Sequence, residues 1–386
     1  MSNNESGKVI SKLSGKVSRN WKRAAMGLGV ALTLPGAANA QSSVTLYGVV
    51  DTGETYTNNQ QGHSAWEATS GNESGPRWGM IGSEDLGGGL KAQFRLENGF
   101  NIDNGKFGQG GRMFGRQAYV GLSSDKLGTV TLGRQYNSVQ DILGNLQISG
   151  TLTGYSAHPH DNDDINNTFR INNAAKYVSP MFAGLQANLV YGFSNSTGFS
   201  QNNSWSAGLT YQNGPFALGA AYARMNNPAS TAVGAVASDN YYGSESMFNT
   251  PLGSATRQQI WGAGGTYALG SALFGLLYTG SRFDVPAASS VHFDNYEGSL
   301  VYYVTPTVAL AIAQVYTHVT QGPLSGHFNQ TSTGAKYLLS KRTDLYVNVL
   351  YQKASSSIGQ AWIESVTAPS STTSQVAVVA GIRHKF

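Results

Sequence analysis

The chain has 386 residues, of which 48 are glycine and none is cysteine, and only 12% of the residues are charged. The absence of cysteine excludes a disulfide framework and any metal site built from cysteine thiolates. The formal net charge is +4, but the first 40 residues hold six basic residues and one acidic residue, which leaves 19 basic and 20 acidic residues in the remainder. The overall basicity therefore comes from the N-terminal segment and gives no support to a nucleic-acid partner.

The N-terminal segment has the three parts of a secretory signal peptide. Residues 1–23 are basic, the eleven residues from Ala24 to Leu34 are apolar, and a small-residue cleavage pattern ends at Ala40. The apolar part is too short for a membrane-spanning helix, which needs about 20 residues. We therefore predict a cleavable signal peptide at 1–40, export from the cytoplasm, and a mature chain at 41–386.

From residue 41 onward the sequence predicts β-strands almost throughout. Segments of about ten residues alternate in polarity, which is typical of strands with one apolar face. The C-terminal segment shows the pattern best, because alternate residues from Val376 onward form a mainly apolar face that ends at Phe386. Sixteen strands are predicted, at 44–52, 77–84, 89–98, 113–123, 127–135, 169–178, 184–192, 203–212, 216–225, 256–268, 271–280, 292–303, 306–317, 328–338, 343–353 and 376–386.

The connections between these strands alternate between short and long. Seven short connections contain the Gly, Pro, Asn and Asp residues of tight hairpins. Eight long connections, rich in Ser, Asn, Gly and Gln, lie near 53–76, 99–112, 136–168, 193–202, 226–255, 281–291, 318–327 and 354–375. A soluble β-sandwich gives no reason for this alternation, whereas membrane barrels have short turns at one end and longer loops at the other. The sequence therefore predicts an all-β fold, a 16-stranded antiparallel transmembrane β-barrel with short periplasmic turns and long extracellular loops.

Other kinds of chemistry have weaker support. The segment His158-Pro159-His160-Asp161 could suggest a metal site, but two histidines one residue apart in a loop match known ligand spacings poorly. The sequence contains no G-x-S-x-G nucleophile elbow, and its Gly-rich stretches lack the context of a phosphate-binding loop. We therefore expect no catalytic residues, no metal site and no cofactor.

Several longer segments carry a family resemblance that spans nearly all of the predicted mature chain. They are VTLYGVVD at 44–51, GSEDLGGGLKA at 82–92, RQAYVGL at 116–122, LGRQY at 132–136, NNAAKY at 172–177 and GIRHKF at 381–386. Together they resemble the trimeric Gram-negative porins of the β-proteobacterial general-diffusion type. The resemblance implies a homotrimer and a third long loop that folds into the lumen to form an eyelet. It also implies that Phe386 belongs to the signal read by the barrel-assembly machinery.

A channel constriction can be predicted from charge and alternation. Sixteen strands enclose a lumen wide enough for water, and the longest loop, 136–168, begins apolar and ends acidic, which is consistent with the inward folding that the resemblance implies. Alternation places basic residues inward, because a lipid-facing Arg at mid-bilayer costs about 2–4 kcal/mol. The predicted basic wall is Arg77, Arg95, Arg116, Arg170 and Lys176, and the predicted acidic loop is Asp141, Asp161, Asp163 and Asp164. By resemblance, Arg77, Arg116 and Arg170 match the family's basic cluster.

These features predict an outer-membrane porin that passes small hydrophilic solutes and inorganic ions by passive diffusion, with a modest anion preference. Three arginines about 6 Å from an anion contribute about 2 kcal/mol before screening, which biases passage without trapping the ion. The expected partners are two further copies of the chain, outer-membrane lipid and lipopolysaccharide, and no nucleic acid. The alternatives are a substrate-specific outer-membrane channel and a plugged barrel that acts as an adhesin or an enzyme.

Overall fold

The computed structural model describes residues 42–239, 241–242 and 245–386. The predicted signal peptide at 1–40 lies outside the described residues. Within the described ranges, no helix has both the length and the apolar character needed to cross a membrane.

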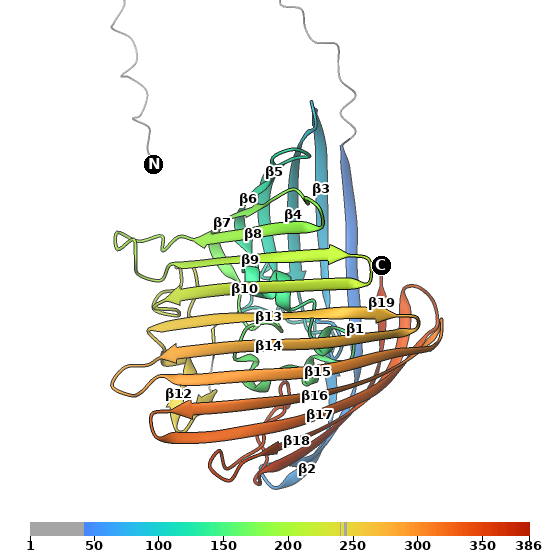
Figure 1. The fold of residues 1–386 in the computed structure, drawn as a ribbon, viewed down its shortest axis with the longest axis vertical. Helices are drawn as coiled ribbons and strands as arrows, with labels where there is room; N and C mark the ends of the chain where they lie inside the picture. Colours follow the sequence, from blue (N-terminus) through green and yellow to red (C-terminus); the bar gives the residue numbers. More distant parts are fainter. Residues whose placement is uncertain (1–41, 240, 243–244) are drawn as a thin grey trace, which may run out of the picture. The chain divides into compact units, whose positions relative to one another are not determined.

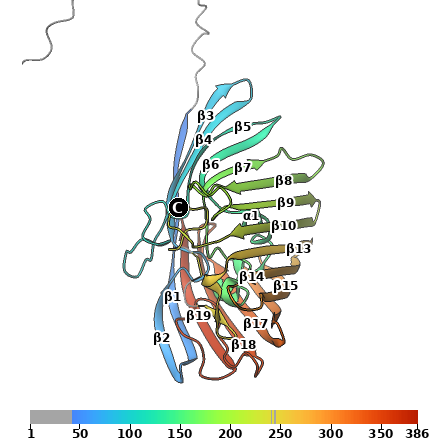
Figure 2. The same ribbon diagram turned by 90° about the vertical axis from the view of Figure 1, so that its left-hand side faces the viewer.

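Sixteen antiparallel strands form a closed barrel, as predicted (Figure 1; Figure 2). They are β1 (Ser43–Gln60), β3 (Arg77–Gly87), β4 (Leu90–Gly99), β5 (Gln117–Ser124), β6 (Gly128–Gln135), β7 (Ile171–Val178), β8 (Leu185–Gly192), β9 (Ser204–Asn213), β10 (Phe216–Asn226), β13 (Arg257–Leu269), β14 (Ala272–Asp284), β15 (Val291–Thr305), β16 (Val308–Gln321), β17 (Leu324–Leu338), β18 (Thr343–Ala354) and β19 (Ser374–Lys385). Each strand pairs with its neighbours along the chain, and β1 closes the ring by pairing with β19. Closure leaves no unpaired sheet edge in the barrel.

Several strands extend beyond their predicted ends, and the largest extensions lie on the long-loop side. The first predicted loop is largely β-structure, because β1 continues to Gln60 and pairs with an extra strand, β2 (His63–Ser70). The loop predicted near 318–327 is wrong, since only Gly322 and Pro323 separate β16 from β17. Alternation of buried and outward residues continues to the end of β16, but its outward residues there are polar and look like loop residues in the sequence.

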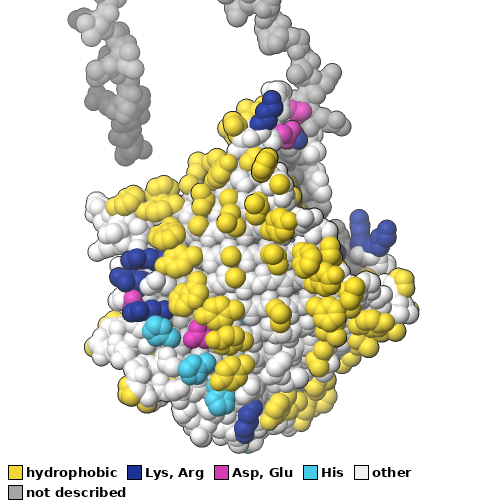
Figure 3. Space-filling model, viewed as in Figure 1, with side chains coloured by type: hydrophobic (Ala, Val, Ile, Leu, Met, Phe, Trp, Pro, Cys, Tyr) yellow, Lys and Arg dark blue, Asp and Glu magenta, His cyan; other side chains and the backbone are white. Residues whose placement is uncertain are grey.

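The outward face of the barrel carries a broad band of hydrophobic side chains (Figure 3). Along three strands, for example, Leu209, Leu218 and Ile312 are exposed, while their chain neighbours point inward and are small or polar. Aromatic side chains border this band toward the long-loop side, at Tyr222, Trp261, Tyr278, Tyr296 and Tyr316, and toward the short-turn side, at Phe216, Tyr267, Phe274 and Tyr302. An apolar band between two aromatic girdles is the arrangement of barrels that span a lipid bilayer.

The third long loop, residues 136–168, folds into the barrel and packs against its inner wall. It contains α1 (Ser138–Leu143) and three 3-10 turns, η1 (Ile148–Gly150), η2 (Gly154–Ser156) and η3 (Pro159–Asp161). Glycines in the wall make room for the apolar side of α1. A Cβ atom at Gly208 would lie 2.4 Å from Ile142, and one at Gly262 would lie 2.8 Å from Leu143. The apolar start of the loop therefore anchors it to β9 and β13, and the predicted in-folding is confirmed.

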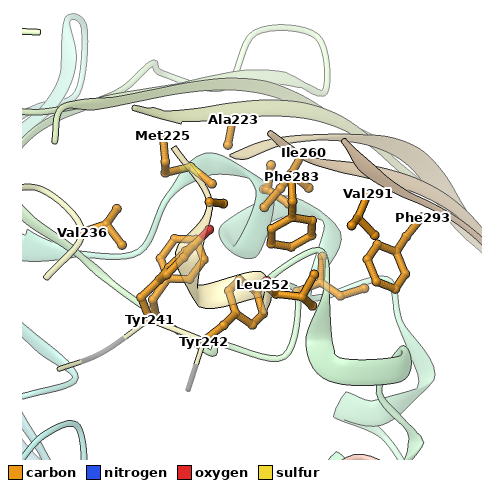
Figure 4. Close-up of a cluster of buried hydrophobic side chains, with 14 of the residues drawn as sticks. Ala223, Met225, Val236, Tyr241, Tyr242, Leu252, Ile260, Phe283, Val291 and Phe293 are labelled. Atoms are coloured by element: carbon orange, nitrogen blue, oxygen red, sulfur yellow. The ribbon is translucent and has the colours of Figure 1, made fainter. Parts of the chain in front are cut away.

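The fifth long loop, residues 227–256, also packs inward and supports the third. It includes the short hairpin of β11 (Ser246–Met247) and β12 (Thr250–Pro251), followed by η4 (Leu252–Ser254). Tyr242 and Leu252 pack against the inward-facing Phe283 of β14 (Figure 4). The hydroxyl of Tyr242 donates a hydrogen bond to the carbonyl of Asp161 at 2.9 Å. The two loops thus stabilise each other inside the barrel, which the sequence pattern did not indicate.

Candidate pore constriction

A cavity of about 560 Å³ lies between the inner wall of the early strands and the third loop. Four of the predicted basic residues line its wall side: Arg77 on β3, Arg95 on β4, Arg116 just before β5, and Arg170 just before β7. The third loop presents uncharged groups to the same cavity, namely Gln140, Gly144, Asn145, Gln147, Gly150, Gly154, Ile165, Asn166 and Asn167. The structure therefore brings the arginines together opposite a neutral loop surface.

Two of these arginines share one carboxylate. Glu97 on β4 accepts a hydrogen bond from Arg116 at 2.8 Å and one from Arg95 at 3.1 Å. The Tyr47 hydroxyl donates to the same carboxylate at 2.7 Å. This network is held by rigid strands and fixes both guanidinium groups at the wall.

Arg77 and Arg170 are held differently. Arg77 is half-buried, and the carboxylate of Glu97 is paired with its neighbours rather than with it. Arg170 is buried, its guanidinium lies 5.4 Å from the centre of the Tyr136 ring, and it donates to the carbonyl of Asn167 at 2.7 Å. An aromatic face and a carbonyl orient a guanidinium without neutralising it, so these groups keep positive charge at the cavity.

Glu73, in the loop before β3, is the second carboxylate that lines the cavity. Its side chain lies 3.0 Å from the ammonium of Lys336 and 3.1 Å from the guanidinium of Arg383. Burial raises the pKa of Glu73 to about 7, although both cations act to lower it. With both carboxylates ionised, four arginines and two glutamates give the lining a net charge of +2.

Three of the predicted loop acids lie elsewhere. Asp161, Asp163 and Asp164 are at most 1% exposed, and they do not line the cavity. Asp161 accepts from the backbone N–H groups of Asn166 and Thr168, each at 2.8 Å. Burial raises the pKa of Asp161 to about 7, and it raises the pKa of Asp164 well above its usual value. An irregular buried loop needs acceptors for its N–H groups, and this placement does not fit the expected acidic side of a constriction.

Asp141 and Lys176 form an ion pair of their own. The Lys176 ammonium contacts the Asp141 carboxylate directly, and the Asn188 side chain donates to that carboxylate at 2.9 Å. The pair ties α1 to β7 and β8, and neither residue lines the cavity. Lys176 therefore does not join the four arginines.

The segment His158-Pro159-His160-Asp161, which could have suggested a metal site, holds the third loop against the barrel wall. His158 is fully buried, with Nδ1 2.7 Å from Asp163 and Nε2 3.3 Å from Glu297 on β15. Burial acts to lower the pKa of His158, but the two carboxylates raise it to about 10, so the imidazolium links the loop to the wall at neutral pH. His160 packs edge-on against Phe328, and burial lowers its pKa to about 4. Within the described part of the chain, no group of three residues is arranged to hold a metal ion.

Phe386 lies where the barrel closes. Its backbone exchanges two hydrogen bonds of 3.0 Å with Gly48 on β1. Its ring covers that glycine, since a Cβ atom at Gly48 would lie 2.3 Å from the ring. Phe386 as a whole is 44% exposed, so it remains accessible at the short-turn end of the barrel.

Sequence reasoning missed both glutamates of the cavity. Glu97 lies two residues after Arg95 on the same strand, so the alternation that places Arg95 inward also places Glu97 inward. Glu73 lies in a loop, where alternation gives no information. The amide groups of the third loop also carried no recognisable signal.

Comparisons with known proteins agree with this architecture. Residues 25–357 match a family model described as Gram-negative porin. An outer-membrane porin of Bordetella pertussis is 31% identical over 388 residues, covering 91% of this chain and 96% of that protein. Outer membrane porin protein 32 of Delftia acidovorans is 30% identical over 92% of this chain and 97% of its own length. The solved anion-selective porin from Comamonas acidovorans superposes with a TM-score of 0.72 at 26% identity, covering 90% of this chain and 100% of that one. The chain therefore belongs to the Gram-negative porin family, and it is an outer-membrane channel for the passive diffusion of small hydrophilic solutes rather than an enzyme.

Proposed function

We propose that this porin is a homotrimeric channel with a modest preference for anions. The observation that carries the proposal is the cavity in which four arginines face a third loop that presents no charged side chain. The solved relative from Comamonas acidovorans, which is described as anion-selective, supports the same reading. The proposed constriction contains Arg77, Arg95, Arg116 and Arg170, and it leaves out Lys176 and the four aspartates first considered.

The magnitude of the charge effect suits a diffusion channel. A net charge of +2 about 6 Å from a permeating anion contributes roughly 1.4 kcal/mol in water, before salt reduces it. This energy favours entry of anions over cations by a modest factor. It is too small to hold an ion in the channel, and rapid passage requires weak binding.

The homotrimer is supported by strand length. The four strands from β5 to β8 have 8 residues each, whereas β13 to β17 have 13 to 15. A strand needs about 9–11 residues to cross the hydrocarbon layer. The outward side chains of the short strands β5 to β8 are apolar and exposed, including Val120, Leu122 and Leu132. Other copies of the chain, arranged around a closed symmetry axis, would cover this surface, and lipid and lipopolysaccharide would surround the rest.

Export and assembly complete the proposal. The segment 1–40 acts as a signal peptide that is removed after Ala40, and the accessible ring of Phe386 takes part in recognition by the assembly machinery. N-terminal sequencing of the protein from outer membranes tests the first point, because the proposal requires a mature chain that starts at Gln41.

Planar bilayer recording tests the proposed selectivity. Purified protein in a membrane that separates two KCl concentrations should give stepwise conductance and a reversal potential of the sign set by chloride. A reversal potential set by potassium would refute the anion preference. An absence of conductance from correctly folded trimers would refute the open channel.

A further inference from the structure

A second cavity, of about 460 Å³, lies at the long-loop end of the barrel. It forms where the third loop, the fifth loop and the eighth long loop, residues 355–373, meet the inward side of β17. Its lining includes His160, Phe248, Asn249, Phe328, Gln360 and Trp362. Within the described part of the chain the two cavities share no lining residue, so the proposed ion path does not explain the second one.

Aromatic rings form one side of this second cavity. The imidazole of His160 packs edge-on against Phe328, with ring centres 6.1 Å apart, and against the indole of Trp362, with ring centres 5.6 Å apart. The backbone N–H of Trp362 donates to the side-chain oxygen of Gln352 at 2.7 Å, and its indole N–H donates to the carbonyl of Val366 at 2.8 Å. Because the indole N–H is already used, the partly exposed Trp362 offers a solute its ring rather than a hydrogen bond.

The backbone adopts an uncommon conformation where it carries two of these rings. His160 and Phe248 have φ of 61° and 49°, and among the described residues they are the only ones with ring side chains in the left-handed region. Phe248 and Asn249 are the two central residues of the turn between β11 and β12, a place that suits Asn and Gly far better than Phe. Gln321 at the end of β16 donates to Thr250 at 2.9 Å and fixes this hairpin to the wall. Backbone strain of this kind clusters at ligand sites.

The polar groups of the second cavity carry no charge. Asn249 and Gln360 are exposed and present side-chain amides, and Ser246 and Ser357 add hydroxyl groups, so the lining offers both donors and acceptors. His160 is neutral as well, because burial lowers its pKa to about 4. No Asp, Glu, Lys or Arg of the described chain lines this cavity, whereas the constriction cavity has four arginines and two glutamates. An ion would lose hydration here without meeting an opposite charge, so the lining favours a neutral solute.

We propose that the second cavity is a binding site for a small neutral carbohydrate, a mono- or disaccharide, on its way into the channel. One face of a pyranose ring presents C–H groups that pack against an aromatic ring, and its hydroxyl groups exchange hydrogen bonds with side-chain amides. Trp362 and Phe248 supply the rings, and Asn249 and Gln360 supply the amides. The volume lies within the range of about 300–1,000 Å³ that is typical of small-molecule sites.

Two loops connect this site to the constriction. Ser365, three residues after Trp362, lines the constriction cavity, and so does Asn166, six residues after His160. A sugar bound in the second cavity is therefore held near the entrance of the constriction. Since rapid passage requires weak binding, the dissociation constant should be about 1 mM. The inference rests on the chain being an outer-membrane channel, and it goes beyond the proposed anion preference without depending on it.

Sugar uptake into proteoliposomes that contain the purified full chain tests the proposal. Maltose and sucrose are the probes, and initial rates are measured from micromolar to high millimolar concentration. The rates should saturate, with half-saturation at about 1 mM, because a binding site of limited number fills. Simple diffusion through an unspecific pore gives rates that rise in proportion to concentration. Proportional rates for both sugars would overturn the proposal.

Two variants test the rings and the amides separately. W362A should raise the half-saturation concentration about tenfold, because the stacking surface is lost. The double variant with N249A and Q360A should also raise it about tenfold, because two hydrogen bonds to neutral groups contribute about that factor. The double variant changes only exposed side chains, so it decides the matter if W362A fails to fold. Unchanged half-saturation in the double variant would refute the site.

Matched controls remove the same kinds of side chain elsewhere. W66A removes a Trp that is 74% exposed on β2. The double variant with Q212A and N213A removes two exposed amides at the short turn after β9. Both controls should keep the half-saturation of the unmodified protein. An equal loss of affinity in the controls and the cavity variants would contradict the assignment to this cavity.

Benzyl alcohol tests whether the rings serve a neutral aromatic solute instead. Tryptophan fluorescence of the purified protein in detergent is titrated with maltose, sucrose and benzyl alcohol. The proposal requires a saturable change with a sugar. A saturable change with benzyl alcohol alone would assign the cavity to aromatic solutes and would contradict the carbohydrate site.

The reversal potential of the unmodified protein separates this inference from the proposed function. Saturable maltose uptake by a cation-selective channel would support the sugar site and refute the anion preference. Proportional uptake by an anion-selective channel would refute the sugar site and leave the anion preference intact.

Discussion

Replacement of Arg77 by Gln should reduce the anion preference of the channel in a way that depends on salt. Arg77 lines the constriction cavity, and the nearby Glu97 is already paired with Arg95 and Arg116. Its removal therefore takes away one positive charge without leaving a buried carboxylate unpaired. The substitution keeps a polar side chain of similar length, so the cavity should keep its shape.

The size of the effect follows from Coulomb's law. A unit charge about 6 Å from the ion path is worth roughly 0.7 kcal/mol in water. Screening with a length of about 10 Å at 0.1 M salt leaves about 0.4 kcal/mol, which is about twofold for each ion. Anions lose this factor and cations gain it, so the anion-to-cation permeability ratio should fall about fourfold. At 1 M salt, where the screening length is about 3 Å, the ratio should change by less than about 1.5-fold.

Reversal potentials of the unmodified protein and the variant at both salt concentrations measure this change. R342Q, which removes a charge from an exposed short turn, serves as the control and should alter the ratio little. An unchanged ratio at 0.1 M, or a change of equal size at 1 M, would refute the assignment of Arg77 to the constriction.

Four further substitutions test other parts of the barrel. The variant E97Q should increase the anion preference, and it should lower the thermal midpoint, because breaking a buried ion pair costs about 3–5 kcal/mol; a less anion-selective channel would contradict the charge assignment. The pKa of His158 is raised to about 10, so its stabilising effect is complete below an ordinary histidine pKa of about 6.5 and is lost as the pH rises toward 10; thermal unfolding of H158Q should lack this pH-dependent part, and equal profiles would disprove it. In G262V the new side chain would collide with Leu143, and overpacking of about 1–3 kcal/mol should displace α1 and increase current noise; quiet channels of normal conductance would argue against the anchor. Alanine at Phe386 should lower the amount of protein in outer membranes, measured by immunoblot, and normal abundance would exclude the assembly role.

The strands could be predicted from the sequence because a bilayer and a water-filled lumen impose a strict alternation. All sixteen predicted strands are present, and the inward directions inferred for Arg95 and Arg116 agree with their place at the cavity. The alternation of apolar and polar residues did not predict strand ends that extend beyond the bilayer, where outward residues need not be apolar. Beyond the bilayer, the outward residues of β16 are polar, such as His318 and Thr320, so the strand and the following loop look alike in composition.

The loop residues were harder to place, for a physical reason. A loop has no fixed alternation, so a run such as Asp161, Asp163 and Asp164 gives no indication of which carboxylates face water. In the structure these groups satisfy backbone N–H groups and the imidazolium of His158. Arg77 and Arg95 could be placed at the wall because strands position them, whereas the neutral loop surface opposite could not be predicted.

The most direct test of the constriction uses the absence of native cysteine, which allows a single thiol to be placed at will. Asn145 lies on the exposed, cavity-facing side of the third loop. We would record single-channel conductance of N145C while adding a bulky, charged thiol reagent, with K341C in an exposed short turn as the control. The account predicts that conductance of N145C falls in discrete steps, three for a trimer, and that K341C is unaffected. Full conductance of N145C after complete labelling would contradict the claim that the third loop and the arginine wall form the constriction.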